Sequence, residues 1–311
     1  MIITADRLTT DGSAHAFLLN VPTDVPILLV SRVGDYRFNQ DILSLKGKKY
    51  VLIDFLEYGW DWKFEFGHTW GVNTDKVDFL KGDEYAKLDD FIRENPPALT
   101  LKRELLLEDV TDNVKPIEYP NYQPSYPVQS KDLFDNRLIN VFYYWGRSNE
   151  NRVRLHSEIW ANSSKNGASI CDNIYYFNQF MAEEKSNNRW ITLNIPHYGR
   201  IDILNLLAIN GSAKLSVSMA GAGIKCFRST GESIVNSVAV MMEDKLAWAY
   251  PFIHLENCIK FTKYGEEIAT IEEALRYDNL YEVYRNGLAT AEKYQINNYI
   301  NNYILPLINK A

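Results

Sequence analysis

The chain has 311 residues, 46% of them hydrophobic and 13% aromatic, with a formal net charge of -7. This composition supplies enough apolar side chains for a packed core and excludes an intrinsically disordered protein. The negative charge argues against a nucleic-acid partner, because phosphate binding requires a broad basic surface. The length fits two domains of ordinary size or one large domain.

The first residues, MIITADRLTTDGS, lack the basic and apolar segments of a secretory signal, so none is expected. No apolar stretch approaches the ~20 residues that a membrane-spanning helix needs. The cysteines Cys171, Cys226 and Cys258 are widely spaced and form no C-x-x-C pair. They indicate neither a disulfide framework nor a zinc site, and we expect a cytoplasmic protein.

Within the first half, VPILLVS (25–31) and KKYVLIDFLE (48–57) predict strands, and GDEYAKLDDFIREN (82–95) predicts a helix. Segment 115–131, KPIEYPNYQPSYPVQSK, then has a proline every three or four residues. Proline excludes helix and central strand, so this segment is predicted to be an extended connector. We therefore expect two domains, residues 1–125 and 126–311.

After the connector, strand patterns alternate with helix patterns. Helical segments separate the first four of the predicted strands, which are LINVFYYW (138–145), ASICDNI (168–174), RWITLNI (189–195), AKLSVSM (213–219) and SVAVMM (237–242). This alternation predicts right-handed βαβ crossovers and a parallel sheet. The C-terminal region is predicted to be helical, with Thr270 and Glu273 at the spacing of a capping box.

Two predicted strand ends in the second half carry glycines followed by charged side chains. Ligands of parallel α/β sheets bind beyond the carboxyl ends of strands, where glycines allow close approach and helix N–H groups favour anions. Arginine adds a fork that suits phosphate oxygens, and Glu232 offers a carboxylate for a ribose diol. After the first of these strands, Gly146 is followed by Arg147, Arg152 and Arg154. The residues predicted to contact a nucleotide are Gly146, Arg147, Arg152, Gly221, Gly223, Lys225, Arg228 and Glu232.

The glycine-bearing stretch GAGIKC (221–226) has a simpler interpretation, since Gly-x-Gly after a strand is common in α/β proteins and often forms only a tight turn. It lacks the third glycine of the dinucleotide-binding fingerprint, and no segment matches the P-loop pattern. A reductase with a Rossmann-bound cofactor and P-loop chemistry are therefore disfavoured.

Residues 135–311 resemble the donor-binding half of GT-B glycosyltransferases, most nearly the exostosin-like ones. The resemblance rests on the strand, turn and helix at 138–154, the stretch LSVSMAGAGIKCFRSTGES, the strand SVAVMMED and the terminal helices. It implies that Glu232 holds the nucleotide ribose and that Arg147 approaches the diphosphate. It also implies that the last helix, 280–309, packs back across to the first domain.

The same resemblance implies a fold of two Rossmann-like α/β domains, with parallel sheets facing a cleft and a helical C-terminus. GT-A transferases hold a divalent metal with an Asp-x-Asp motif, which this chain lacks. A GT-B protein is implied to need no metal and no cofactor, because cations and helix dipoles neutralise the leaving diphosphate. The expected partners are a nucleotide sugar and a glycan or other acceptor.

In the first half, residues 52–71 gather acidic side chains and a histidine among tryptophans, LIDFLEYGWDWKFEFGHTWG. A catalytic base for a sugar acceptor would lie on this side of a cleft, and aromatic rings suit stacking on sugars. Glu57, Asp61 and His68 are the candidates. The alternative interpretation is a strand edge followed by a tryptophan-rich core loop.

The sequence therefore predicts a glycosyltransferase that moves a sugar from a nucleoside-diphosphate donor to an unknown acceptor. A non-catalytic nucleotide- or glycan-binding protein with a GT-B-like fold is the alternative.

Overall fold

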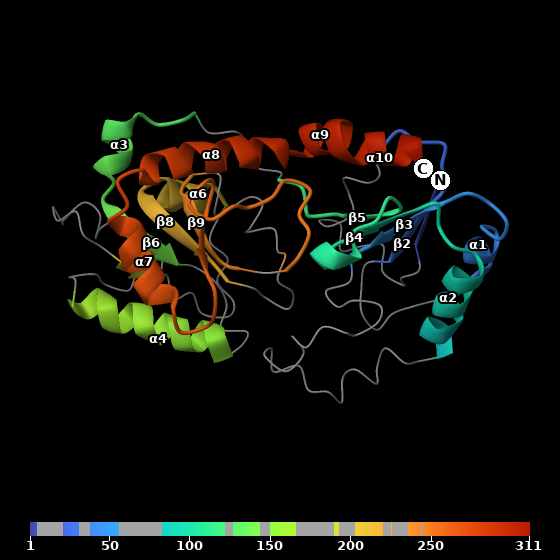
Figure 1. Ribbon diagram of the computed structural model, residues 1–311, viewed down its shortest axis with the longest axis horizontal. Helices are drawn as coiled ribbons and strands as arrows, with labels where there is room; N and C mark the ends of the chain where they lie inside the picture. Colours follow the sequence, from blue (N-terminus) through green and yellow to red (C-terminus); the bar gives the residue numbers. More distant parts are fainter. Residues whose placement is uncertain are drawn as a thin grey trace.

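The computed structural model describes residues 1–4, 21–30, 38–55, 83–121, 127–143, 150–165, 190–192, 203–219, 225, 236–243 and 245–311. These residues form two parallel sheets and a helical C-terminal region (Figure 1). No helix in these ranges is both long and apolar enough to cross a membrane.

The first sheet is built in chain order, β1-β2-β3-β4-β5, with every neighbouring pair parallel. Its central strands are fully buried because they consist of aliphatic runs such as ILLV and VLID. The strands are β1 (Ile2–Thr4), β2 (Ile27–Val30), β3 (Val51–Asp54), β4 (Leu99–Lys102) and β5 (Val114–Pro116), accompanied by the helices α1 (Gln40–Leu43) and α2 (Asp83–Glu94).

The second sheet has the order β10-β9-β8-β6-β7, again with parallel pairs throughout. Its strands are β6 (Ile139–Tyr143), β7 (Trp190–Thr192), β8 (Ala213–Ser218), β9 (Val238–Met242) and β10 (Ile259–Phe261), and its helices are α3 (Lys131–Asp135), α4 (Glu150–Lys165), α6 (Ile203–Gly211) and α7 (Glu267–Leu275). The predicted fold class, α/β with two parallel sheets and a helical C-terminus, is confirmed.

The C-terminal helices run from the second sheet back to the first (Figure 1). They comprise α8 (Leu280–Lys293), α9 (Ile296–Tyr299), the π-helical turn η6 (Ile300–Ile304) and α10 (Leu305–Lys310). Helix α8 packs on the second sheet's core through Leu280, Val283 and Tyr284. Beyond it, Ile304 and Ile308 are buried in the same cluster as Ile27 and Leu29 of β2. The predicted return of the last helix to the first half is therefore confirmed.

Two details differ from the sequence-based expectations. Lys115 and Pro116 belong to strand β5 instead of the connector, and proline is tolerated there because β5 lies at the edge of its sheet. Thr270 is not a helix cap, since α7 begins at Glu267 and the Thr270 N–H donates to the Glu266 carbonyl. The strand predicted at 168–174 and the helix after it lie outside the described residues.

Replacing Ile304 with alanine should lower the free energy of unfolding by about 2–5 kcal/mol, because the side chain is fully buried between the C-terminal helix and the first sheet. Asn302→Ala is the matched control, since Asn302 lies on the same turn and is exposed. Denaturant unfolding monitored by circular dichroism measures both. Equal effects of the two substitutions would contradict this packing.

Candidate functional site at the facing strand ends

The carboxyl ends of the two sheets meet in the middle of the molecule. Leu105 follows β4, and its carbonyl accepts from the Ala247 N–H, which follows β9, at 2.7 Å. Leu107 N–H donates to the Lys245 carbonyl at 2.8 Å, and an antiparallel bridge joins Leu106 to Leu246. The two edges that usually bind ligands in open α/β sheets are thus joined directly by backbone hydrogen bonds.

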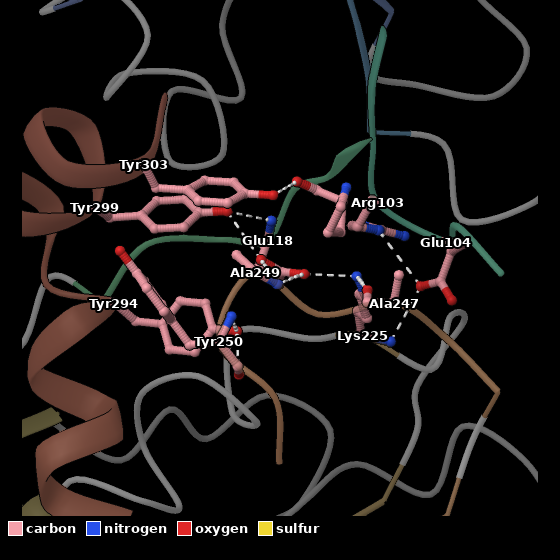
Figure 2. A network of polar contacts seen from close by, with 11 residues as sticks. Arg103, Glu104, Glu118, Lys225, Ala247, Ala249, Tyr250, Tyr294, Tyr299 and Tyr303 are labelled. Atoms are coloured by element: carbon pink, nitrogen blue, oxygen red, sulfur yellow. Dashed lines mark hydrogen bonds and ion pairs between the residues drawn. The ribbon is translucent and has the colours of Figure 1, made fainter. Parts of the chain in front are cut away.

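A buried lysine connects the halves at this junction. Lys225 follows β8 in the chain and is 2% exposed. Its Nζ lies 2.6 Å from Glu118 Oε1 and also donates to the Ala247 carbonyl (Figure 2). The ammonium lies 4.8 Å from the ring of Trp248. Its backbone N–H donates to Glu104 Oε1 at 3.0 Å. The backbone N–H and the side-chain ammonium of Lys225 are therefore both bound by carboxylates of the first half.

Glu118 follows β5, and both of its carboxylate oxygens are hydrogen-bonded. Oε1 accepts from Lys225, and Oε2 accepts from the Tyr299 hydroxyl at 2.9 Å. The Ala249 N–H adds a contact of 3.3 Å to Oε1. A buried charge is tolerated when a counter-ion and hydrogen bonds replace its water, which is the case for Glu118.

A second buried pair completes the cluster at the end of β4. Arg103 Nε lies 3.5 Å from Glu104 Oε1, and the guanidinium donates to the Tyr119 hydroxyl. Both side chains of the pair are less than one-twentieth exposed. The two cations and two carboxylates of Arg103, Glu104, Glu118 and Lys225 balance one another in formal charge.

Tyrosines of the C-terminal helix cover one side of Glu118. The rings of Tyr299 and Tyr303 stack at 5.3 Å, and the Tyr303 hydroxyl donates to the Pro116 carbonyl at 2.8 Å (Figure 2). Tyr294 donates its hydroxyl to the Tyr250 carbonyl at 2.9 Å. Burial, together with the negative charge of Glu118, raises the pKa of Tyr294 and Tyr299 well above 10. These phenols are therefore neutral hydrogen-bond donors at neutral pH.

Of the predicted nucleotide contacts, the structure describes Lys225 and Arg152. The sequence predicted a diphosphate contact for Lys225, whereas the structure gives its ammonium Glu118 and a carbonyl as partners. Arg152 lies in α4, is 5% exposed and donates to the Met219 carbonyl at 3.0 Å, at the end of β8. Its neighbour Arg154 pairs with Glu158 and Glu267. A nucleotide contact of Lys225 or Arg152 stays a prediction.

The remaining predicted site residues lie outside the described residues, and their roles also stay predictions. They are the donor-side residues Gly146, Arg147, Gly221, Gly223, Arg228 and Glu232 and the acceptor-side residues Glu57, Asp61 and His68. In the described part of the chain, no three His, Cys, Asp or Glu side chains are grouped so as to hold a metal ion.

Sequence reasoning missed Glu104, Glu118 and Tyr299. Glu118 stands inside the proline-rich segment, in IEYPNY, where a carboxylate normally faces water. Its partner Lys225 is 107 positions away, and no local pattern connects the two. The only available signal was the repeated tyrosine of the C-terminal helix, Tyr299 and Tyr303, which lie four residues apart and share a helix face.

No family model and no curated protein sequence matches the chain. Solved structures with a similar arrangement include the GtfA/B complex, with 11% identity, a TM-score of 0.49 and coverage of 96% of this chain and 60% of that one. TarM has 12% identity and a TM-score of 0.49, with coverage of 95% and 57%.

The pneumococcal O-GlcNAc transferase GtfA in complex with UDP and GlcNAc has 9% identity and a TM-score of 0.40, with coverage of 94% and 58%. This chain spans about three fifths of the length of each of these proteins. Similarities this low carry no argument about the activity of this chain.

Removing either partner of the buried pair between Lys225 and Glu118 should destabilise the protein strongly. Glu118→Gln and Lys225→Met should each lower the free energy of unfolding by about 3–5 kcal/mol, because each leaves a buried charge without its counter-ion. The double variant Glu118→Gln/Lys225→Met should lose less than the sum of the single losses. Denaturant titrations measure all of these.

The two single variants and the double variant form a double-mutant cycle. Its matched control is Arg285→Met, which breaks an exposed ion pair with Glu282 on α8 and should change stability little. Strictly additive losses of Glu118 and Lys225 would contradict a direct coupling between the two side chains.

Stability should fall as the pH rises above ~10. In the unfolded chain the phenols of Tyr294 and Tyr299 ionise near pH 10, whereas in the folded chain their pKa is raised well above that value. The unfolded state therefore loses these protons first, and the stability present below pH ~10 is lost at higher pH. Urea unfolding at increasing pH, with tyrosinate absorbance followed in parallel, measures this. Ionisation of all tyrosines without loss of stability would refute the assignment.

Proposed function

We propose that this protein is a metal-independent glycosyltransferase that moves a sugar from a nucleoside-diphosphate donor to a glycan or other acceptor. The observation that carries the proposal is the meeting of the carboxyl ends of two parallel sheets, joined through Leu105 and Ala247. Each such edge gathers loops and helix N-termini, and two edges that face each other can hold two substrates side by side. Sugar transfer requires such a pair of substrates.

The second half would bind the donor. Helix α4 begins shortly after β6, with Gly146 and Arg147 between them in the chain, so a diphosphate at its N-terminus would meet backbone N–H groups and a guanidinium. Glu232 would hold the ribose. Because Lys225 is already neutralised by Glu118, the leaving diphosphate would depend on Arg147 and Arg228 for its positive charge.

The first half would bind the acceptor. Strand β3 ends at Asp54, and the candidate bases Glu57, Asp61 and His68 follow it in the chain. A base in this position would take the proton of the attacking acceptor hydroxyl as the bond to the donor sugar forms and the diphosphate leaves. The exostosin-like subtype is part of this proposal.

The engagement of Lys225 favours a second candidate function. A donor site that has lost one of its predicted cations to an internal ion pair has less charge for stabilising a leaving diphosphate. A protein that binds a nucleotide or glycan without catalysis would not need that charge. Binding of a nucleotide sugar without turnover, across varied acceptors, would identify this alternative.

Calorimetric titration with UDP and GDP sugars tests donor binding, with NAD as the negative control. Arg147→Ala should weaken the diphosphate nucleotide about ten- to a hundredfold and leave the bare nucleoside nearly unchanged, whereas Glu232→Ala should weaken both. Arg285→Ala, an exposed arginine on α8, is the control. Unchanged affinities in both variants, or no binding of any nucleotide sugar, would reject the proposed function. Release of nucleoside diphosphate then separates transfer from binding alone.

A further inference from the structure

A partly open hollow of about 340 Å³ lies where the two halves and the C-terminal helix meet. Small-molecule pockets usually measure ~300–1,000 Å³, so this one fits a small ligand. Its lining comes from segments far apart in the sequence, Leu107, Val110, Pro116, Leu246, Ala247, Trp248, Pro251, Phe252, Lys260 and Tyr303.

Apolar side chains make up most of the wall and also its rim. Leu246, Trp248 and Phe252 are buried in the protein, whereas Leu107 is 62% and Val110 is 36% exposed. Exposed aliphatic side chains beside an apolar hollow provide surface that an apolar ligand can remove from water. The hollow therefore suits a ligand with an apolar body.

Among the described residues that line the hollow, Lys260 alone is charged. In the described part of the chain its ammonium forms no ion pair, and its backbone N–H donates to His254 Nδ1. The Tyr303 hydroxyl is already engaged with the Pro116 carbonyl. The strongest polar group left for a ligand is thus a cation at the edge of an apolar wall, which favours a single anionic group.

Tyr303 reaches the hollow from the π-helical turn Ile300–Ile304. Such turns are rare and often occur at functional sites. The hollow also depends on the folded junction, because Leu107 belongs to the first half and Phe252 and Lys260 belong to the second. A ligand seated there would contact both halves at once.

We propose that this hollow binds a small free carboxylate with an apolar body, comparable in size to a medium-chain fatty acid. Lys225 and Arg152, the two proposed donor residues that the structure describes, are not part of its lining. Its test requires no nucleotide and no turnover, so its outcome is independent of the proposed function.

Octanoate and octanol provide the test, because they share the alkyl chain and differ in charge. In calorimetric titrations octanoate should bind about fivefold more tightly than octanol, the effect of a partly exposed ion pair. Lys260→Met should abolish this preference and leave octanol binding unchanged. Lys263→Met, a nearby and largely exposed lysine, should leave the preference intact.

Leu107→Gln should weaken both ligands, because it removes apolar surface from the rim. Leu133→Gln on α3 is the control, with an exposure of 64% against 62% for Leu107. Absence of octanoate binding, or a preference that survives Lys260→Met, would overturn the proposal. So would sedimentation with oleate-containing phosphatidylcholine vesicles in the absence of any response to free octanoate, because that result would assign the surface to a membrane.

Discussion

The buried contact between Lys225 and Glu118 is the constraint on which the arrangement of the two sheets depends. Removing a carboxylate and an ammonium from water costs several kcal/mol for each ion, and only close pairing and further hydrogen bonds offset that cost. The partners that supply them come from distant parts of the chain: Glu118 follows β5, Ala249 follows β9, and Tyr299 belongs to the C-terminal helix. Neither half alone can satisfy these charges, so the junction requires both.

The C-terminal helix meets this requirement by an irregularity in its winding. Residues four apart in an α-helix are offset by about 40° around the axis, so a stripe of such residues drifts away from its partner surface. Tyr299 and Tyr303 nevertheless both reach the first half, and Ile304 and Ile308 remain buried against β2. The π-helical turn Ile300–Ile304 contains more residues than an α-helical turn. Each residue is therefore rotated by a smaller angle, which offsets part of this drift. This short stretch of helix thereby supplies tyrosines to the polar junction and isoleucines to the apolar core.

Much of the fold could be predicted from the sequence, because strands such as β2, β3 and β9 are buried and mostly aliphatic. Strands β1, β4, β5 and β10 were missed, since strands of three or four residues are too short to show a clear periodicity. The candidate site was harder to predict. Lysines are mostly exposed, so local sequence placed Lys225 at a ligand, whereas its environment is set by carboxylates more than a hundred positions away. Tertiary pairing of this kind leaves no local pattern.

The junction and the proposed donor site share one segment of chain, and this connects the stability of the fold to its function. The segment between β8 and β9 contains Gly221, Gly223, Arg228 and Glu232, which were predicted to bind the nucleotide. Within that segment Lys225 is held at its backbone by Glu104 and at its side chain by Glu118. Both carboxylates belong to the first half. Lys225, inside the segment proposed to bind the donor, is therefore held by the half that would bind the acceptor, so the two proposed substrate sides would be assembled together and not in two independent units.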